Sequence, residues 1–257
     1  MTAYYNEFDK YAAQWLRNLI AAGHIAPGVV DERSIEDVHP SDLAGFTQCH
    51  FFAGIGVWSY ALRRAGWPDD RPVWTGSCPC QPFSVSGKGT GFSDERDLWP
   101  SWCHLIRERG PAEVLGEQVA SPLAKPWIDR VCHDVEALDY AFGAVVFPAA
   151  AVRAHHVRKR AYWVAKSSRH GWRKDRRHAA EGAGADRGWQ QADQPGHASS
   201  AVDWVRCVDG KSRPVEPGSF PLVDEAPCRV GRLRAYGNAI DAEAARVFIE
   251  ATMRASA

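Results

Sequence analysis

Strand-like runs alternate with amphipathic helical stretches along the first 165 residues of the chain. This alternation is typical of an α/β fold, in which helices join the strands of one sheet and cover its faces. We predict strands within residues 2–7, 47–56, 71–78, 112–119, 142–150 and 160–165, and helices over 9–22, 57–66, 97–109 and 124–139.

The composition changes after residue 165. Residues 166–200 are polar, rich in glycine and alanine, and almost free of aliphatic side chains, which indicates a separate segment. Residues 236–255 then indicate a turn followed by a helix. We therefore divide the chain into a main domain over 1–165, a small and partly flexible region over 166–230, and a C-terminal turn and helix over 231–257 that return to the main domain.

The overall composition excludes several classes of protein. No apolar run approaches the ~20 residues that a membrane helix needs, and the N-terminus lacks the pattern of a signal peptide, so we expect a cytoplasmic protein. The seven cysteines form no CxxC pair, which favours reduced thiols and predicts no metal site. The 31 basic and 31 acidic residues balance, so any affinity for nucleic acid must come from a local patch.

A glycine-spaced turn joins the predicted strand near residue 50 to the helix that follows. Gly54 and Gly56 would let a ligand approach the backbone and the helix N-terminus, although such a turn also serves packing alone. About 25 residues later, a second strand ends in the sequence Pro79-Cys80-Gln81. Open α/β sheets place their binding sites at the carboxyl ends of strands, so both loops point to one site.

Four polar side chains near this point are candidates for chemistry. Cys80 lies on a loop rich in Pro, Ser and Gly, which favours a reactive thiol over a buried inert one. Glu117 ends a predicted strand, where it is either a solvated carboxylate or, beside Cys80, a proton donor whose pKa burial raises. Arg158 and Arg160 enter the next strand two residues apart and so point to one face, either as a site or as a charged strand edge.

Five motifs occur in an order that resembles the cytosine-5 DNA methyltransferases. They are FFAGIG at 51–56, PCQPFS at 79–84, GEQV at 116–119, HVRKR at 156–160 and YGNAI at 236–240. The resemblance covers about 50–165 and 229–250, and it implies a Rossmann-like sheet that binds S-adenosylmethionine, with helices on both faces. It also implies a compact enzyme of phage or restriction-modification type.

The resemblance assigns a role to each candidate residue. Cys80 would add to C6 of a cytosine flipped out of double-stranded DNA, and Glu117 would protonate the ring at N3. Arg160 would hold O2 of the base, with Arg158 and His156 supporting the site. The remaining implied positions are Phe52, Ala53, Gly54, Ile55, Gly56, Asn238 and Ala239 toward the cofactor, and Gln81 and Ser84 toward the base.

One part of the family pattern is missing from its usual place. The family has two further strands between its glycine loop and its Pro-Cys-Gln motif, which carry the acids for the ribose and the adenine. Here residues 1–45 resemble those strands, with Glu7 for the ribose and Asp31 for the adenine. We therefore predict a permuted cofactor half, against the alternative that residues 1–45 form a cap and that Asp69 or Asp70 binds the ribose.

Target recognition is expected in the region over 166–230. Its residues 166–178 hold six Lys or Arg around a tryptophan, among them Arg173 and Lys174, as phosphate contact with stacking requires. A solvated charged loop is the alternative for these residues. We expect a monomer that methylates DNA in a bacterial or phage-infected cell. The rival functions are a DNA-binding remnant with weakened activity, the same chemistry on RNA or a free nucleotide, and a thiol oxidoreductase.

Overall fold

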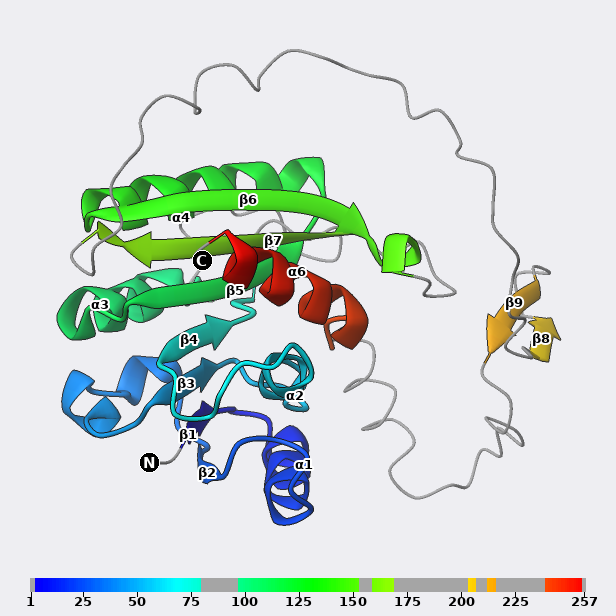
Figure 1. The fold of residues 1–257 in the computed structure, drawn as a ribbon, viewed down its shortest axis with the longest axis horizontal. Coiled ribbons are helices and arrows are strands. Elements are labelled where there is room, and N and C mark those ends of the chain that lie inside the picture. Colours follow the sequence, from blue (N-terminus) through cyan, green and yellow to red (C-terminus); the bar gives the residue numbers. More distant parts are fainter. Residues whose placement is uncertain are drawn as a thin grey trace. The chain divides into compact units, whose positions relative to one another are not determined.

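The computed structural model describes residues 3–79, 97–152, 159–168, 203–206, 212–215 and 239–255 (Figure 1). The chain divides into two units, Met1–Arg173 with Val230–Ala257, and Lys174–Arg229. In the second unit, β8 (Asp203–Arg206) and β9 (Ser212–Val215) form an antiparallel pair. None of the helices within the described ranges is long and apolar enough to cross a membrane.

The first unit is built on one seven-stranded sheet in the order β2-β1-β3-β4-β5-β7-β6. The strands from β2 to β5 pair in parallel, whereas β7 runs antiparallel to both of its neighbours. The predicted strands are confirmed, and β2 is added to them. Their bounds are β1 Ala3–Asn6, β2 Gly28–Asp31, β3 Gln48–Phe51, β4 Val73–Gly76, β5 Glu113–Val119, β6 Tyr140–Pro148 and β7 Lys159–Ser167.

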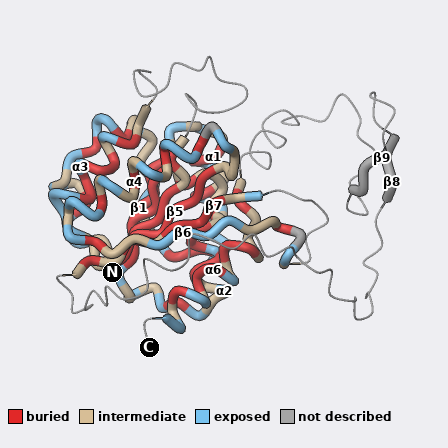
Figure 2. The backbone as a smooth tube through the Cα atoms, turned by 90° about the horizontal axis from the view of Figure 1, so that it is seen from above, coloured by how far each residue is buried: buried red, intermediate tan, exposed pale blue. Residues whose placement is uncertain are grey.

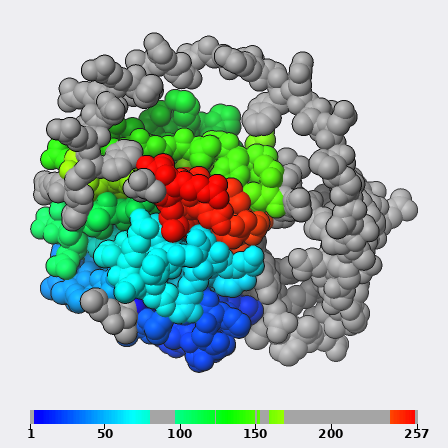
Figure 3. All heavy atoms as spheres, viewed as in Figure 1, coloured from blue at the N-terminus to red at the C-terminus, as the bar shows by residue number. Residues whose placement is uncertain are grey.

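Helices cover both faces of this sheet, which confirms the predicted α/β class (Figures 1 and 2). One face carries α1, α2 and α6, and α6 lies against α2 (Figure 3). The other face carries α3 and α4 over a cluster of buried tryptophans. The helices are α1 Lys10–Ala21, α2 Val57–Arg64, α3 Trp99–Arg109, α4 Lys125–Ala137 and α6 Ala242–Arg254, within two residues of the predicted ranges where a range was predicted.

Two crossovers of the sheet differ in hand. β1 leads through α1 to β2 in one direction along the sheet, and β3 leads through α2 to β4 in the opposite direction. Both helices nevertheless cover the same face, since Tyr5 packs in one cluster with Leu16 of α1 and hydrogen-bonds Ser59 of α2. The crossovers β1-α1-β2 and β3-α2-β4 therefore have opposite hands, although crossovers between parallel strands are right-handed in about 98% of cases.

His50 of β3 is fully buried beneath this helical layer. Its ring stacks on Tyr5 at 4.8 Å between centroids, and its Nδ1 lies 2.8 Å from Thr75 Oγ1. Burial lowers the pKa of His50 to about 3, because desolvation penalises the charged imidazolium. The folded protein therefore keeps His50 neutral at a pH where the unfolded chain takes up a proton.

The free energy of unfolding is accordingly expected to fall as the pH drops below about 6.5, where an unfolded histidine becomes charged. One proton bound only in the unfolded state gives a slope of about 1.4 kcal/mol per pH unit. Urea unfolding between pH 6.5 and 4 should show a shallower slope in His50→Gln than in the wild type. His24→Gln, which removes an exposed histidine, should keep the wild-type slope; equal slopes in His50→Gln and wild type would contradict the assignment.

Candidate active site

The glycine loop follows β3 at the carboxyl edge of the sheet. The loop has left-handed backbone at Phe52 (φ 50°), Gly54 (φ 55°) and Gly56 (φ 80°). Gly56 is also the N-cap of α2, and a Cβ placed on it would lie 3.0 Å from the side chain of Leu16 in α1. The non-glycine residue in this set, Phe52, holds a conformation that a side chain rarely adopts, as is common at functional sites.

Glu7 meets this loop from the end of β1. Its Oε2 accepts a hydrogen bond from the N–H of Gly54 at 2.6 Å, and its Oε1 accepts one from the N–H of Asp9 at 2.9 Å. The backbone N–H of Ala53 also donates to the carbonyl oxygen of Asn6 at 3.0 Å. Glu7 and Gly54, which are 47 positions apart in the chain, therefore lie together at the carboxyl ends of β1 and β3. The neighbouring Phe8 is 73% exposed there.

The alternative carboxylates lie elsewhere. Asp69 and Asp70 follow α2 and precede β4, so they lie at the amino ends of the parallel strands, opposite the glycine loop. Asp69 is also ion-paired with Arg63, at 2.6 Å between Arg63 Nη2 and Asp69 Oδ2. The position of these residues does not support a contact with a ligand at the glycine loop.

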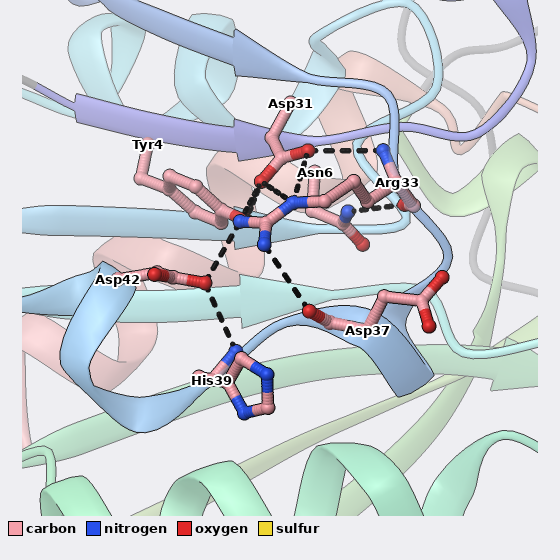
Figure 4. A network of polar contacts seen from close by, with 7 residues as sticks. All are labelled: Tyr4, Asn6, Asp31, Arg33, Asp37, His39 and Asp42. Atoms are coloured by element: carbon pink, nitrogen blue, oxygen red, sulfur yellow. Dashed lines mark hydrogen bonds and ion pairs between the residues drawn. The ribbon is translucent and has the colours of Figure 1, made fainter.

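Asp31 ends β2, next to β1, and belongs to a polar network (Figure 4). Its carboxylate accepts from the hydroxyl of Tyr4 at 2.7 Å and from the Arg33 guanidinium at 2.7 Å. Arg33 also reaches Asp42 Oδ2 at 2.8 Å. Burial alone would raise the pKa of Asp31, but the hydrogen bonds from Arg33 and Tyr4 outweigh it and lower that pKa.

The strand that leads to Cys80 is held in place by its neighbours. Gln118 of β5 donates from Nε2 to the carbonyl oxygen of Cys78 at 3.1 Å, and Trp58 of α2 donates from Nε1 to Ser77 Oγ at 3.1 Å. Cys78 is buried, as expected of a packing residue. Cys80, Gln81 and Ser84 lie outside the described residues.

Glu117 and Arg160 form an ion pair across β5 and β7. Arg160 Nε lies 2.8 Å from Glu117 Oε1, and the two side chains are only 14% and 7% exposed. Each charge loses hydration on burial, and the attraction between the two charges offsets part of that cost. Since β4 and β5 are parallel neighbours, this pair stands at the same edge of the sheet as the end of β4. A carboxylate and a guanidinium thus stand beside the carboxyl end of β4.

The structure places only part of the remaining predicted set. Ala239 is half-buried and precedes α6. The other predicted positions lie outside the described residues: Arg158, His156, Asn238, Arg173 and Lys174. The sequence analysis gave no role to Arg33 or to Gln118. Neither residue stands out by type, so their roles emerge only from their contacts.

Parts of the chain are similar in sequence to known proteins. Residues 67–185 match the family model described as C-5 cytosine-specific DNA methylase. The type II methyltransferase M.HhaI of Haemophilus parahaemolyticus is 33% identical over 37% of this chain and 30% of its own length. M.NgoMIV of Neisseria gonorrhoeae is 30% identical over 29% of this chain and 36% of its own length. M.AplI of Arthrospira platensis is 27% identical over 61% of this chain and 47% of its own length.

The chain thus spans about a third to a half of the length of these curated relatives. Among solved structures, a DNMT2 mutant of Spodoptera frugiperda has a TM-score of 0.43 and 16% identity, covering 68% of this chain and 45% of its own. Over residues 67–185 the chain is therefore similar to the C-5 cytosine-specific DNA methylases, and its curated relatives are type II methyltransferases.

Proposed function

We propose that the protein is a DNA cytosine-5 methyltransferase, which moves a methyl group from S-adenosylmethionine to C5 of a flipped-out cytosine. The observation that carries this proposal is the buried Glu117–Arg160 ion pair beside the end of β4. A general acid and a guanidinium are the groups that a pyrimidine ring needs before a thiol can add to it. The family match supports the same reaction.

The residues at the glycine loop fit the cofactor. Glu7 offers a carboxylate to the ribose hydroxyls, and the left-handed backbone at Gly54 and Gly56 lets a ligand come close to the main chain. Asp31 and the turn that follows it stand on the adenine side, and Asn238 and Ala239 are assigned to the cofactor by the family motif. When bound, S-adenosylmethionine supplies an electrophilic methyl group.

The protein's own residues activate the base. The Cys80 thiolate forms a bond to C6 while Glu117, which first takes up a proton from water, gives that proton to N3, and this makes C5 nucleophilic. After C5 has gained the methyl group, a base removes the C5 proton, the electron pair re-forms the ring double bond and the Cys80 sulfur leaves, and N3 returns its proton to Glu117. Arg160 holds O2 of the ring, with Arg158 and His156 in support. Gln81 and Ser84 are proposed to contact the base, as the family motif implies.

Double-stranded DNA is the proposed partner of a monomeric enzyme in the bacterial cytoplasm. The target base must leave the duplex, because a thiol on a sheet edge cannot reach C6 of a stacked base. The basic residues Arg173 and Lys174 are proposed to contact phosphates, within a target-recognition region over 166–230. For comparison with the bounds of that region, the strand β7 ends at Ser167, and the second compact unit of the chain covers Lys174–Arg229.

Bisulfite sequencing of DNA from cells that express the protein tests the proposed function. We expect protected cytosines at one recurring sequence in cells with the wild type, and none in cells with Cys80→Ser. Full conversion of cytosine in both would exclude methylation of DNA. The same pattern of protection in both would show that the methylation comes from another enzyme.

We further propose that the cofactor half is permuted, with Glu7 on the ribose. The support is the place of β1 and β2 beside β3, the Glu7–Gly54 hydrogen bond, and the opposite hands of the two crossovers. A changed chain order leaves strands and helices in place and alters only their connections, which accounts for an unusual hand.

Glu7→Ala is expected to weaken S-adenosylmethionine binding by about 10- to 100-fold, because each charge-assisted hydrogen bond contributes roughly 1.5–3 kcal/mol. Asp69→Ala and Asp70→Ala should bind the cofactor like the wild type, since they lie at the opposite edge of the sheet. Isothermal titration calorimetry on the three variants measures this. Normal binding by Glu7→Ala together with weak binding by an Asp69 or Asp70 variant would refute the permuted arrangement.

A further inference from the structure

The acceptor capacity of Asp31 is already largely filled within the protein. A carboxylate offers about four lone-pair sites. The donors to Asp31 are the Tyr4 hydroxyl at 2.7 Å, the Arg33 backbone N–H at 2.9 Å, Arg33 Nη2 at 2.7 Å, and Arg33 Nε, which lies 3.1 and 3.0 Å from the two oxygens. Oδ2 takes three of these contacts and Oδ1 takes two, with Nε shared between them, so the Asp31 carboxylate already uses most of its acceptor capacity within the protein.

Arg33 extends the contacts of Asp31 across the turn that follows β2. Its Nη2 also donates to Asp42 Oδ2 at 2.8 Å, and its Nη1 donates to the carbonyl oxygen of Asp37 at 3.2 Å. Asp42 in turn accepts from the N–H of His39 at 3.1 Å. The guanidinium therefore closes the turn over residues 31–42 at several points (Figure 4).

The sheet anchors the other side of this turn. The buried amide of Asn6 donates from Nδ2 to the carbonyl oxygen of Arg33 at 2.9 Å. Tyr4, also on β1, is buried against Phe46 and Phe51 while its hydroxyl holds Asp31. Because Asn6 directly precedes Glu7, the turn and the proposed ribose ligand are fixed to the same strand.

We propose that Asp31 is a positioning residue rather than a ligand of the cofactor: it acts through Arg33, which clamps the 31–42 turn in the shape that receives the adenine. The inference rests on the proposed function and revises one assignment within it. Arg33 suits this role because its planar fork can serve two carboxylates at once, which a lysine ammonium cannot do. The adenine is then read by the backbone of the turn, not by the Asp31 carboxylate.

Two ligands separate a positioning role from direct contact. One is S-adenosylhomocysteine, and the other is its analogue with purine in place of adenine, which lacks the exocyclic amino group. If Asp31 only positions the turn, Asp31→Asn should weaken both ligands by the same factor. We expect about a fivefold to tenfold loss for each, given the modest value of partly exposed ion pairs.

A double-mutant cycle tests whether Asp31 acts through Arg33. We expect Arg33→Met to match Asp31→Asn, and the double variant to bind within about twofold of either single variant, because both remove one clamp. Arg17→Met is the matched control. This substitution removes the exposed ion pair between Arg17 Nη2 and Glu32 Oε1, which lie 2.6 Å apart, and Glu32 directly follows Asp31 in the chain. The Arg17→Met variant should bind both ligands like the wild type. Circular dichroism confirms that each variant is folded.

Three results would overturn the inference. Loss of affinity in Asp31→Asn for the adenine ligand alone would make Asp31 a direct ligand. Additive losses in the double variant would show that Asp31 and Arg33 act independently. If the wild type bound neither ligand, the proposed function would fall and this inference with it, an outcome distinct from the first two because it appears before any substitution.

Discussion

Replacing Cys80 with serine is expected to abolish methyl transfer while DNA binding survives. A hydroxyl group at neutral pH lacks the nucleophilicity of a thiolate, so no bond to C6 of cytosine can form. DNA that contains 5-fluorocytosine measures this step, because the fluorine blocks removal of the group at C5 and holds the protein on the base. The wild type should be captured as a covalent complex that survives denaturing electrophoresis, and Cys80→Ser should not.

Cys78→Ser is the matched control for this experiment. Cys78 lies two residues away, and its buried thiol packs in the core cluster beneath the sheet. It should be captured by the modified DNA like the wild type, at some cost in stability. Capture of Cys80→Ser with failure of Cys78→Ser would show that the nucleophile has been assigned to the wrong cysteine.

Glu117→Gln is expected to lower the turnover number by about 10²- to 10⁴-fold, the contribution that general acid catalysis typically makes. Glutamine keeps the size of the side chain but has no proton to give to N3 of the ring. It also leaves Arg160 without its partner at 2.8 Å. Affinity for the cofactor should change little. Single-turnover methyl transfer with saturating cofactor and DNA gives the rate.

Glu113 supplies a control on the same strand. It lies at the other end of β5, is similarly buried, and pairs with Lys166 at 3.2 Å. Glu113→Gln should therefore lower thermal stability and leave the turnover number near that of the wild type. If Glu117→Gln behaved in the same way as Glu113→Gln, Glu117 would have a structural role only.

The main elements of the fold could be predicted from the sequence because their patterns are local. Strands β1, β3, β4 and β5 are almost wholly buried, and each carries apolar side chains within a short run of residues between helices. β2 escaped the pattern because it is an edge strand of four residues with a half-exposed side chain at Val29. The strand conformation of β2 is stabilised by its parallel pairing with β1 and is not indicated by its own hydrophobic pattern.

The candidate site divides in the same way. The family resemblance of residues 1–45 assigned Glu7 to the ribose, near the glycine loop, and the structure brings its carboxylate to Gly54. The roles of Gln118 and Arg33 could not be predicted, because each depends on contacts with residues 9 to 40 positions away. The hydrogen bonds that the Asp31 carboxylate accepts could not be predicted either, because a sequence pattern does not show which donors lie close to a side chain in the folded protein.

The most direct test of the central claim is to identify the product made by the purified protein. The protein is incubated with duplex DNA and S-adenosylmethionine whose methyl group carries deuterium, and the digested nucleosides are analysed by mass spectrometry. The account predicts deuterated 5-methyldeoxycytidine from the wild type and none from Cys80→Ser. Label on N4 of cytosine or on adenine, or transfer that is undiminished in Cys80→Ser, would contradict it.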